Sequence, residues 1–193
     1  MAEIIEEKRL LRERLRKARV EHAATLPREV SALVFNRPPR AVTDLVPDGA
    51  TIGLYRAMDG EARTAGYLRH FFEAGHPVAL PFVKRDAGMT FHLHTDPYEE
   101  SDLQPGPMGL LQPDPATPVV TPEVLFVPLV GFTATGERLG QGAGYYDRYL
   151  AEHPGVIAIG MAWDVQEVPS LPIAVHDMPL TAIVTPTRLL GPF

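Results

Sequence analysis

The chain has 193 residues, of which 45% are hydrophobic and 22% charged, and its net charge is −6. This length favours one domain with a sizeable core. The negative charge argues against general nucleic-acid binding, and no apolar run reaches the length of a membrane span, so we expect no nucleic-acid partner and no membrane partner. The sequence contains no cysteine, which excludes disulfides and cysteine nucleophiles and fits a cytoplasmic protein.

The first patterned segment, residues 3–24, is rich in Glu, Arg, Lys, Leu and Ala and predicts a helix. An apolar stripe and a basic face follow helical spacing; the stripe is Leu11, Leu15 and Ala18, and the face is Lys8, Arg12, Arg16 and Arg19. Residues 1–20 carry a local charge of +3 against −9 for the remainder. This imbalance suggests a local anion site, although a solvated helix face is the alternative. Lys8 and Arg12 could grip a polyphosphate only if the helix packs beside the glycine loop described below.

Strand and helix patterns alternate along the rest of the chain. We expect strands at residues 51–55, 78–83, 89–94, 124–129, 156–163 and 182–185. One helix ends at Gly75 and another opens at Tyr145, and the prolines between residues 97 and 122 predict a long irregular connection. The order predicts an α/β fold: a single domain over residues 1–193, with a mostly parallel open sheet flanked by helices on both faces.

The most distinctive segment is Arg138-Leu-Gly-Gln-Gly-Ala-Gly-Tyr-Tyr-Asp147, with glycines at three alternate positions. Glycine permits positive φ, and successive N–H groups in such a turn can form an anion-binding nest ahead of a helix. The segment matches neither the Walker loop, because it has no lysine, nor the dinucleotide fingerprint, because its spacing is G-x-G-x-G. A tight structural turn is the alternative. Arg138 and Asp147 favour a ligand, since one can bind phosphate oxygens and the other a hydrated cation.

Three places fall where ligands sit in open α/β sheets, beyond the carboxyl ends of strands, and they could converge on one cleft. They are the glycine loop itself, the pair Trp163-Asp164, and the turn that carries Asp59 and Glu61. The pair His176-Asp177 has two interpretations: an ordinary turn, or a carboxylate that binds Mg²⁺ together with Asp147. His92 and His94 share one face of a predicted strand, and a half-exposed strand face is favoured over a metal site because no third ligand is near.

The stretch from Phe126 to Leu150, centred on Arg-Leu-Gly-x-Gly-x-Gly-Tyr-Tyr-Asp, resembles the signature of the 5-formyltetrahydrofolate cyclo-ligase family. Other marks of that family occur in the same order and extend the resemblance over nearly the whole chain: Lys8-x3-Arg12-x6-Arg19, Met58-Asp-Gly-Glu61-x2-Thr64, Gly75–Pro81, His176-Asp177 and Ile183–Thr185. The chain departs from the usual pattern at Gln112, Thr133 and Gln141.

The resemblance implies an activity: ATP-dependent cyclisation of 5-formyltetrahydrofolate to 5,10-methenyltetrahydrofolate, with release of ADP and phosphate, through a phosphorylated formyl intermediate. It implies ATP as co-substrate, Mg²⁺ as metal, and small-molecule partners only; we expect a monomer. By the same resemblance Arg138 and Tyr145 would be catalytic, and Asp147 and Asp177 would bind the metal. ATP would contact Lys8, Arg9, Leu10, Leu11, Arg12, Arg138, Leu139, Gly140, Gln141, Gly142, Ala143, Gly144, Tyr145 and Tyr146. The folate would contact Arg56, Glu61, Gln141, Gly142, Ala143, Gly144 and Tyr145.

Two other functions remain open from the sequence. A non-catalytic homologue that binds nucleotide or folate is suggested by the departures at Gln112 and Thr133, whereas the intact Asp147 and Asp177 argue against it. A small-molecule kinase on another α/β scaffold is the other alternative, and the missing Walker lysine argues against it.

Overall fold

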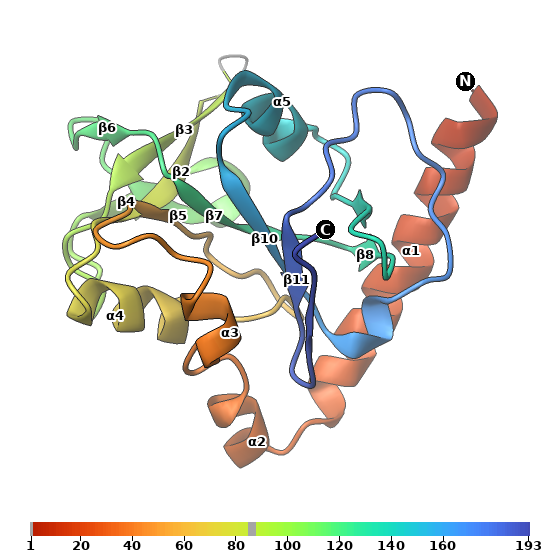
Figure 1. Ribbon diagram of the computed structural model, residues 1–193, viewed down its shortest axis with the longest axis horizontal. Helices are drawn as coiled ribbons and strands as arrows, with labels where there is room; N and C mark the ends of the chain where they lie inside the picture. Colours follow the sequence, from red (N-terminus) through yellow and green to blue (C-terminus); the bar gives the residue numbers. More distant parts are fainter. Residues whose placement is uncertain (1, 85–87) are drawn as a thin grey trace.

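The centre of the molecule is an eight-stranded sheet in the order β12-β11-β10-β7-β1-β2-β3-β6 (Figure 1). It is seen in a computed structural model that describes residues 2–84 and 88–193. The strands from β11 to β2 in this order run parallel, and β12, β3 and β6 pair antiparallel at the edges. The strands are β1 (Ile52–Gly53), β2 (Val78–Lys84), β3 (Gly88–Leu93), β6 (Val119–Val120), β7 (Val124–Pro128), β10 (Ile157–Met161), β11 (Ala182–Val184) and β12 (Leu189–Leu190).

Central strand β7 shows why the sheet is covered on both faces. Successive side chains of a strand point to opposite faces. Val124 and Phe126 accordingly enter one buried cluster, whereas Leu125 and Val127 enter another. Helix α4 (Ala65–Glu73) packs on the first cluster and α5 (Tyr145–Glu152) on the second. The predicted fold, a mostly parallel open sheet with helices on both faces, is therefore confirmed.

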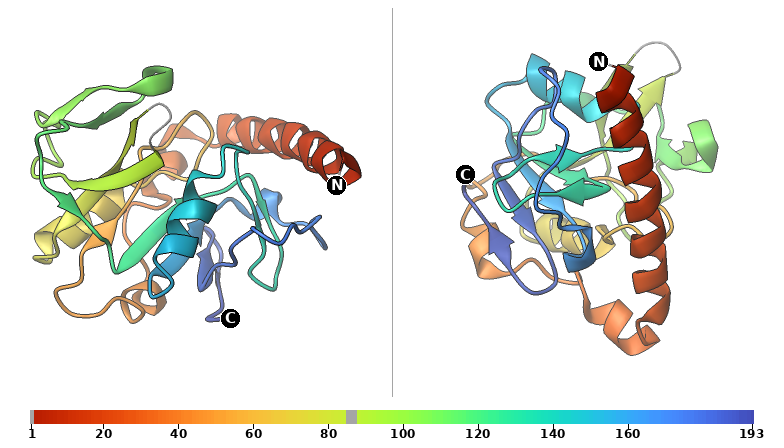
Figure 2. Two further views of the ribbon diagram at one scale, coloured as in Figure 1. Left: turned by 90° about the horizontal axis from the view of Figure 1, so that it is seen from above. Right: turned by 90° about the vertical axis from the view of Figure 1, so that its right-hand side faces the viewer.

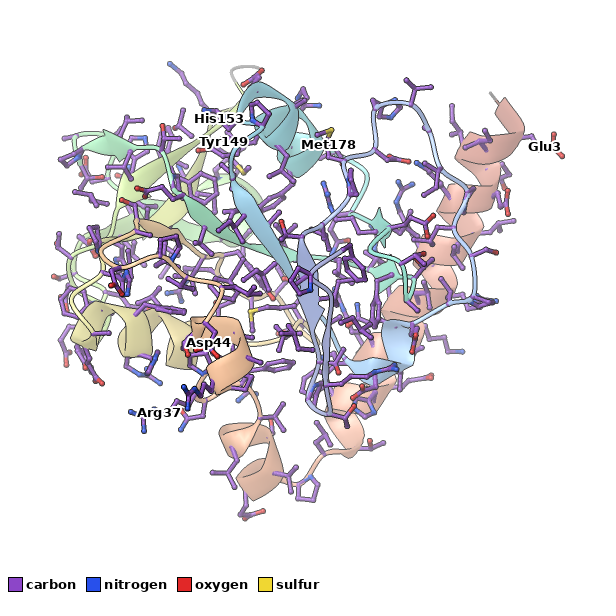
Figure 3. All side chains as sticks on the ribbon, viewed as in Figure 1. Glu3, Arg37, Asp44, Tyr149, His153 and Met178 are labelled. Atoms are coloured by element: carbon purple, nitrogen blue, oxygen red, sulfur yellow. The ribbon has the colours of Figure 1, made fainter. Side chains whose placement is uncertain are left out.

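On α5, Tyr149 stacks on His153 with their ring centroids 4.1 Å apart, close to Met178 of the loop before β11 (Figure 3). The Tyr149 hydroxyl is buried and has no hydrogen-bond partner within the described part of the chain. Burial raises the pKa of Tyr149 to about 12, because a buried phenolate loses its hydration. This side chain therefore belongs to the core rather than to a site.

Helix α1 (Ala2–Thr25) forms a long rod along one side of the molecule (Figure 2). Its residues Leu11 and Leu15 pack on a third cluster, which contains Val130, Leu139 and Val168. This cluster lies on a small hairpin of β8 (Gly131–Phe132) and β9 (Arg138–Leu139), which leads directly into the glycine loop. The predicted apolar stripe thus fixes the helix beside that loop. Within residues 2–84 and 88–193, no helix combines the length and apolarity needed to cross a membrane.

Short elements account for the remaining differences from the predicted ones. The proline-rich connection is not wholly irregular, since it contains a hairpin, a 3-10 turn and the edge strand β6; the hairpin is β4 (Leu103–Pro105) with β5 (Leu111–Pro113), and the turn is η1 (Pro107–Gly109). The strand expected at 51–55 ends at Gly53, because the Tyr55 carbonyl turns to accept a hydrogen bond from the Thr64 hydroxyl. The helices α2 (Arg28–Leu33) and α3 (Arg40–Thr43) and the 3-10 turn η2 (Asp164–Gln166) complete the chain.

Candidate active site

The basic face of α1 lies directly on the glycine loop. The Arg12 Nε donates to the Gly140 carbonyl at 2.8 Å. One turn later, Arg16 donates from Nε to the Gln141 side-chain oxygen at 2.9 Å and from Nη2 to the Gln141 carbonyl at 2.8 Å. The helix therefore packs beside the loop, which the sequence analysis required if Lys8 and Arg12 are to bind a polyphosphate.

The loop itself is held in a conformation that requires glycine. Gly142 has φ +108° and Gly144 has φ +68°, a region that L side chains rarely adopt. At Gly142 space is not the constraint, because an added Cβ would lie 3.5 Å from the Arg12 guanidinium, an ordinary contact. Gly144 is the N-cap of α5, and no side chain caps this helix. Its first N–H groups are therefore left for another acceptor, which an anion can provide.

Two ion pairs lie beside the glycine loop. Lys8 pairs with Asp177, and Arg138 Nη2 donates to Asp147 Oδ1 at 2.6 Å. The main chain of Met178 joins both sides of the second pair, since its carbonyl accepts from Arg138 and its N–H donates to Asp147 at 3.2 Å. Four residues predicted from distant parts of the chain are thus brought to one place.

These charged groups act on one another's pKa values. Burial lowers the pKa of Arg138, and Asp147 and Asp177 both oppose that shift. Burial and then Arg16 lower the pKa of Arg12, opposed by the same two carboxylates. Burial by itself would raise the pKa of Asp177, but hydrogen bonds from Lys8 and from the Ala174 N–H outweigh it, so this pKa lies below its usual value. Both arginines stay charged, because a guanidinium does not lose its proton in proteins.

The two carboxylates were predicted to bind Mg²⁺, which prefers oxygen ligands and usually takes one or two from a protein, with waters and phosphates supplying the others. Within the described residues, no group of three or more His, Asp or Glu side chains is arranged to hold a metal. Asp147 and Asp177 are moreover already paired with cations. This donor set fits an ion shared between the protein and a bound phosphate, not a site that the protein forms alone.

A second cluster forms around Glu61, in the turn after β1. Its Oε1 accepts from Arg19 Nη1 at 3.2 Å and from the Gln141 side chain at 2.9 Å, and its Oε2 accepts from the Met58 N–H at 2.9 Å. The side chains of Glu61 and Arg19 are each only 4% exposed. In the same region Trp163, at the end of β10, donates to the Gly60 carbonyl at 2.8 Å. The predicted convergence of the three strand ends is therefore observed.

Other residues predicted for the site lie less centrally. Arg9 bonds to Glu6 and Glu13 on the exposed side of α1, and Leu10 is 53% exposed, so neither lines the loop. Arg56 pairs with Glu100, and among the described residues it makes no hydrogen bond or ion pair with the Glu61 cluster. The remaining members lie in or beside the loop: Leu11 and Leu139 pack below it, Ala143 is exposed, and Tyr145 and Tyr146 begin α5. Burial raises the pKa of Tyr146, Glu61 raises it further, and Arg138 lowers it.

The sequence did not identify Arg16 and Arg19 as members of the site. Their spacing from Lys8 and Arg12 was the available signal, since all four share one helix face. The expected half-exposed face for His92 and His94 was wrong: both are buried, His92 with Nδ1 3.0 Å from the Thr117 carbonyl and His94 with Nδ1 2.8 Å from Asp102. The reason is that residues of the connection after β3 lie against them: Thr117, just before β6, contacts His92, and Asp102, just before β4, contacts His94.

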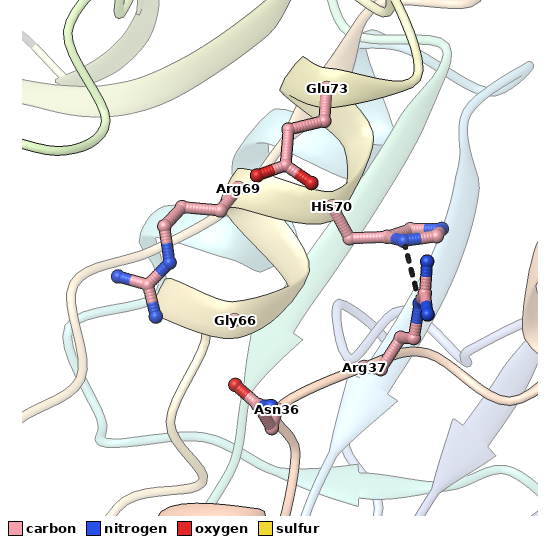
Figure 4. A pocket seen from close by; sticks show the side chains of 6 residues that line it. All are labelled: Asn36, Arg37, Gly66, Arg69, His70 and Glu73. Carbon is pink, nitrogen blue, oxygen red and sulfur yellow. Dashed lines mark hydrogen bonds between the residues drawn. The ribbon is translucent and has the colours of Figure 1, made fainter.

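A surface pocket on α4 is separate from these clusters (Figure 4). It is lined by Asn36, Arg37, Gly66, Arg69, His70 and Glu73. Arg69 points to one side of the helix, whereas Arg37 lies on the other side beside His70, with Arg37 Nε 3.5 Å from His70 Nδ1. The two cations therefore do not converge on one ligand.

The fold and the clusters define a class: a parallel-sheet α/β protein whose glycine loop, flanked by cations, suits a phosphate-bearing ligand. The family model described as 5-formyltetrahydrofolate cyclo-ligase family matches residues 4–186. The curated 5-formyltetrahydrofolate cyclo-ligase of Escherichia coli (strain K12) is 30% identical over 93% of this chain and 98% of its own length. That of Saccharomyces cerevisiae is 30% identical over 92% and 94%. The chain belongs to the 5-formyltetrahydrofolate cyclo-ligase family.

Solved structures agree on the fold. The 5,10-methenyltetrahydrofolate synthetase of Aquifex aeolicus aligns with a TM-score of 0.72 at 23% identity and covers 94% of this chain and 93% of its own. A 5,10-methenyltetrahydrofolate synthetase from Mycoplasma pneumoniae aligns with a TM-score of 0.67 at 23% identity, over 92% and 97%. The architecture described above is thus shared across nearly the full length.

Proposed function

We propose that this chain converts 5-formyltetrahydrofolate and ATP into 5,10-methenyltetrahydrofolate, ADP and phosphate. One observation supports this most directly: the hydrogen bond from Arg12 to Gly140, which packs a basic helix onto the glycine loop beside Lys8 and Arg138. Cations and free helix N–H groups at one place suit the phosphates of a nucleotide. Membership of the cyclo-ligase family supplies the reaction to which this arrangement is suited.

The chemistry must turn the oxygen of an N5-formyl group into a leaving group. That oxygen attacks the γ-phosphorus of ATP, the bond to ADP breaks, and an imino-phosphate forms. N10 then attacks the formyl carbon and loses its proton, and the C–O bond breaks, so that the former formyl oxygen departs as part of inorganic phosphate. The protein's task is to align the reactants and to neutralise the charge that develops.

In this proposal Lys8, Arg12 and Arg138 hold phosphate oxygens, and the N–H groups at the start of α5 support the developing negative charge. Leu11, Leu139 and the loop from Gly140 to Tyr146 surround the nucleotide. Glu61 orients the formyl-bearing region of the folate, with Tyr145 on the loop side and Arg56 at the end of β1. Mg²⁺, held by Asp147 and Asp177 together with phosphates, would screen the phosphate charge during transfer.

The competing function, a homologue that binds nucleotide or folate without catalysis, is disfavoured because both carboxylates stand beside the phosphate-binding cations rather than apart from them. We further propose that the protein acts in the cytoplasm, for which the absence of cysteine is the supporting feature, and that it acts as a monomer.

The proposal is tested by mixing the protein with MgATP and 5-formyltetrahydrofolate and following the methenyl chromophore together with phosphate release. We expect one phosphate per methenyl group formed, and no product when ATP is omitted or when a chelator removes the divalent metal. Product formed at full rate under either of those conditions would overturn the role of ATP and Mg²⁺. Protein that binds both substrates and never forms product would favour the non-catalytic homologue.

A further inference from the structure

The side chain of Gln141 joins the glycine loop to two other parts of the molecule. Its amide nitrogen donates to Glu61 Oε1 at 2.9 Å, and its amide oxygen accepts from Arg16 Nε at 2.9 Å. The Gln141 carbonyl accepts a second bond from Arg16. One amide therefore connects α1, the loop and the turn after β1, which are separated by 125 and 80 positions in the chain.

Glu61, the acceptor of this bond, is held from three directions. Arg19 and Gln141 both donate to its Oε1, and the Met58 N–H donates to its Oε2. Arg19 reaches it from inside the protein, since its side chain is almost fully buried and its Nη1 also lies 3.5 Å from the Leu129 carbonyl. Of the two side chains that donate to Glu61, Gln141 alone is carried by the glycine loop, so its bond is the one that depends on where that loop stands.

We propose that Gln141 is a positioning residue: it acts on the folate through Glu61, by fixing that carboxylate against the glycine loop, and not by touching the folate itself. The inference rests on the proposed function, in which Glu61 contacts the folate. It departs from the resemblance, which places Gln141 among the residues that contact both ligands. The position is also one where this chain departs from the family's usual pattern.

The choice of glutamine follows from the charges on either side. A residue here must accept from a guanidinium and donate to a carboxylate, and an amide does both at once. Glutamate would keep the bond to Arg16 but would direct a second negative charge at Glu61. Methionine has a similar length and can make neither bond, so it removes the connection with little change in volume. Comparing these two substitutions distinguishes the effect of the Gln141 hydrogen bonds from the effect of its packing.

The test measures the dissociation constant for 5-formyltetrahydrofolate by calorimetric titration without nucleotide. We expect Gln141→Met to weaken folate binding about tenfold, the effect of losing one hydrogen bond to a charged group. Glu61→Gln should weaken it at least as much. In the Glu61→Gln background, adding Gln141→Met should change the affinity by less than about twofold, because residues that act through one contact are not additive. Gln104→Met, a substitution of the same type on strand β4, is the matched control.

The second variant, Gln141→Glu, keeps the side-chain length and should weaken folate binding more than Gln141→Met does. Wild-type affinity in Gln141→Met, or in Glu61→Gln, would overturn the proposal. The proposal would also be overturned if the double variant weakened folate binding by the product of the two single-variant factors. Independent effects of that kind would mean that Gln141 touches the ligand directly. Failure of the proposed reaction is seen separately, as wild-type protein that makes no methenyl product, and it leaves these affinities unaffected.

Discussion

At the scale of single residues, two of the three proposed phosphate-binding cations are paired with carboxylates of the protein itself. Asp177 pairs with Lys8 and Asp147 with Arg138, so a bound nucleotide must compete with a carboxylate for each cation. Arg12 differs, because its Nε is bonded to a neutral carbonyl and its charge is balanced only from a distance. We therefore expect Arg12 to interact most freely with an incoming phosphate.

The first prediction concerns these cations. Lys8→Ala and Arg12→Ala should each raise the KM for ATP about ten- to a hundredfold, since a charge-assisted contact contributes roughly 1.5–3 kcal/mol. Steady-state kinetics at saturating folate measure the effect. Arg14→Ala, an exposed arginine of the same helix, is the control and should leave this KM unchanged. Wild-type ATP binding in both variants would mean that the basic face only contacts solvent and the loop.

The second prediction concerns Asp147. Asp147→Asn should reduce turnover at least about a hundredfold, the scale of losing a main electrostatic stabiliser. The fold should also lose stability, because the side chain of the partner Arg138 is only 2% exposed and its buried charge would lose this counter-ion. We expect urea unfolding to show a loss of about 1–3 kcal/mol, with the exposed Asp48→Asn as control. Full activity in Asp147→Asn would remove this residue from the metal site.

The third prediction follows from the lowered pKa of Asp177. A carboxyl group whose pKa is lower in the folded than in the unfolded state stabilises the fold above its unfolded pKa of about 3.9, and this stabilisation is lost as the pH falls through the folded value. Asp177→Asn should therefore be less stable than wild type at pH 7, and the difference should shrink as the pH falls below the unfolded pKa and through the lower folded pKa. Urea unfolding of both proteins across this range measures it. A difference that does not depend on pH would show that the ion pair with Lys8 is not its source.

At the scale of secondary-structure elements, apolar packing supports α1 beside the glycine loop, in addition to the hydrogen bonds of Arg12 and Arg16. Leu15 is 4% exposed and packs with Val130, Leu139 and Val168. The fourth prediction is that Leu15→Ala lowers the free energy of unfolding by about 2–5 kcal/mol, as large-to-small core substitutions do. It should also weaken ATP binding, because the basic face loses its support. Ile5→Ala, at a position that is 63% exposed on the same helix, should change neither quantity. If Leu15→Ala lost stability but bound ATP normally, the packing of α1 would not be needed for ATP binding.

The elements also show how far the sequence predicted the fold. The long patterns of α1, β2, β7 and α5 were identified within a few residues, because each carries its own periodicity or glycine signal. The hairpin β8–β9 and strand β12 were not predicted, because two-residue strands have no periodicity and are defined only by their partners. Each cluster of the site was inferred from local signals, but the bond between Arg19 and Glu61, 42 positions apart, is set by packing that no local pattern encodes.

At the scale of the whole molecule, the exposed apolar side chains of the described residues are spread over several elements. The most exposed come from separate elements, among them Leu33 of α2, Val119 of β6 and Val175 of the loop before β11. Stable homodimers need a continuous apolar patch. The fifth prediction is that light scattering during gel filtration gives the mass of one chain at micromolar concentration. A mass of two chains that persists on dilution would contradict it and would place an interface on one of these segments.

The hydrogen bond between Arg12 and Gly140 spans 128 positions, and this separation has a consequence for synthesis. A ribosome adds residues at about 5–20 per second, so the helix leaves it about 6–26 s before the loop that it will contact. During that interval Leu11 and Leu15 have no hairpin to cover them, and Lys8 has no Asp177. The proposed nucleotide-binding site therefore cannot form in a partly made chain. It closes only when the last third of the protein returns to its first helix, so that a truncated product would expose an apolar stripe and bind no ATP.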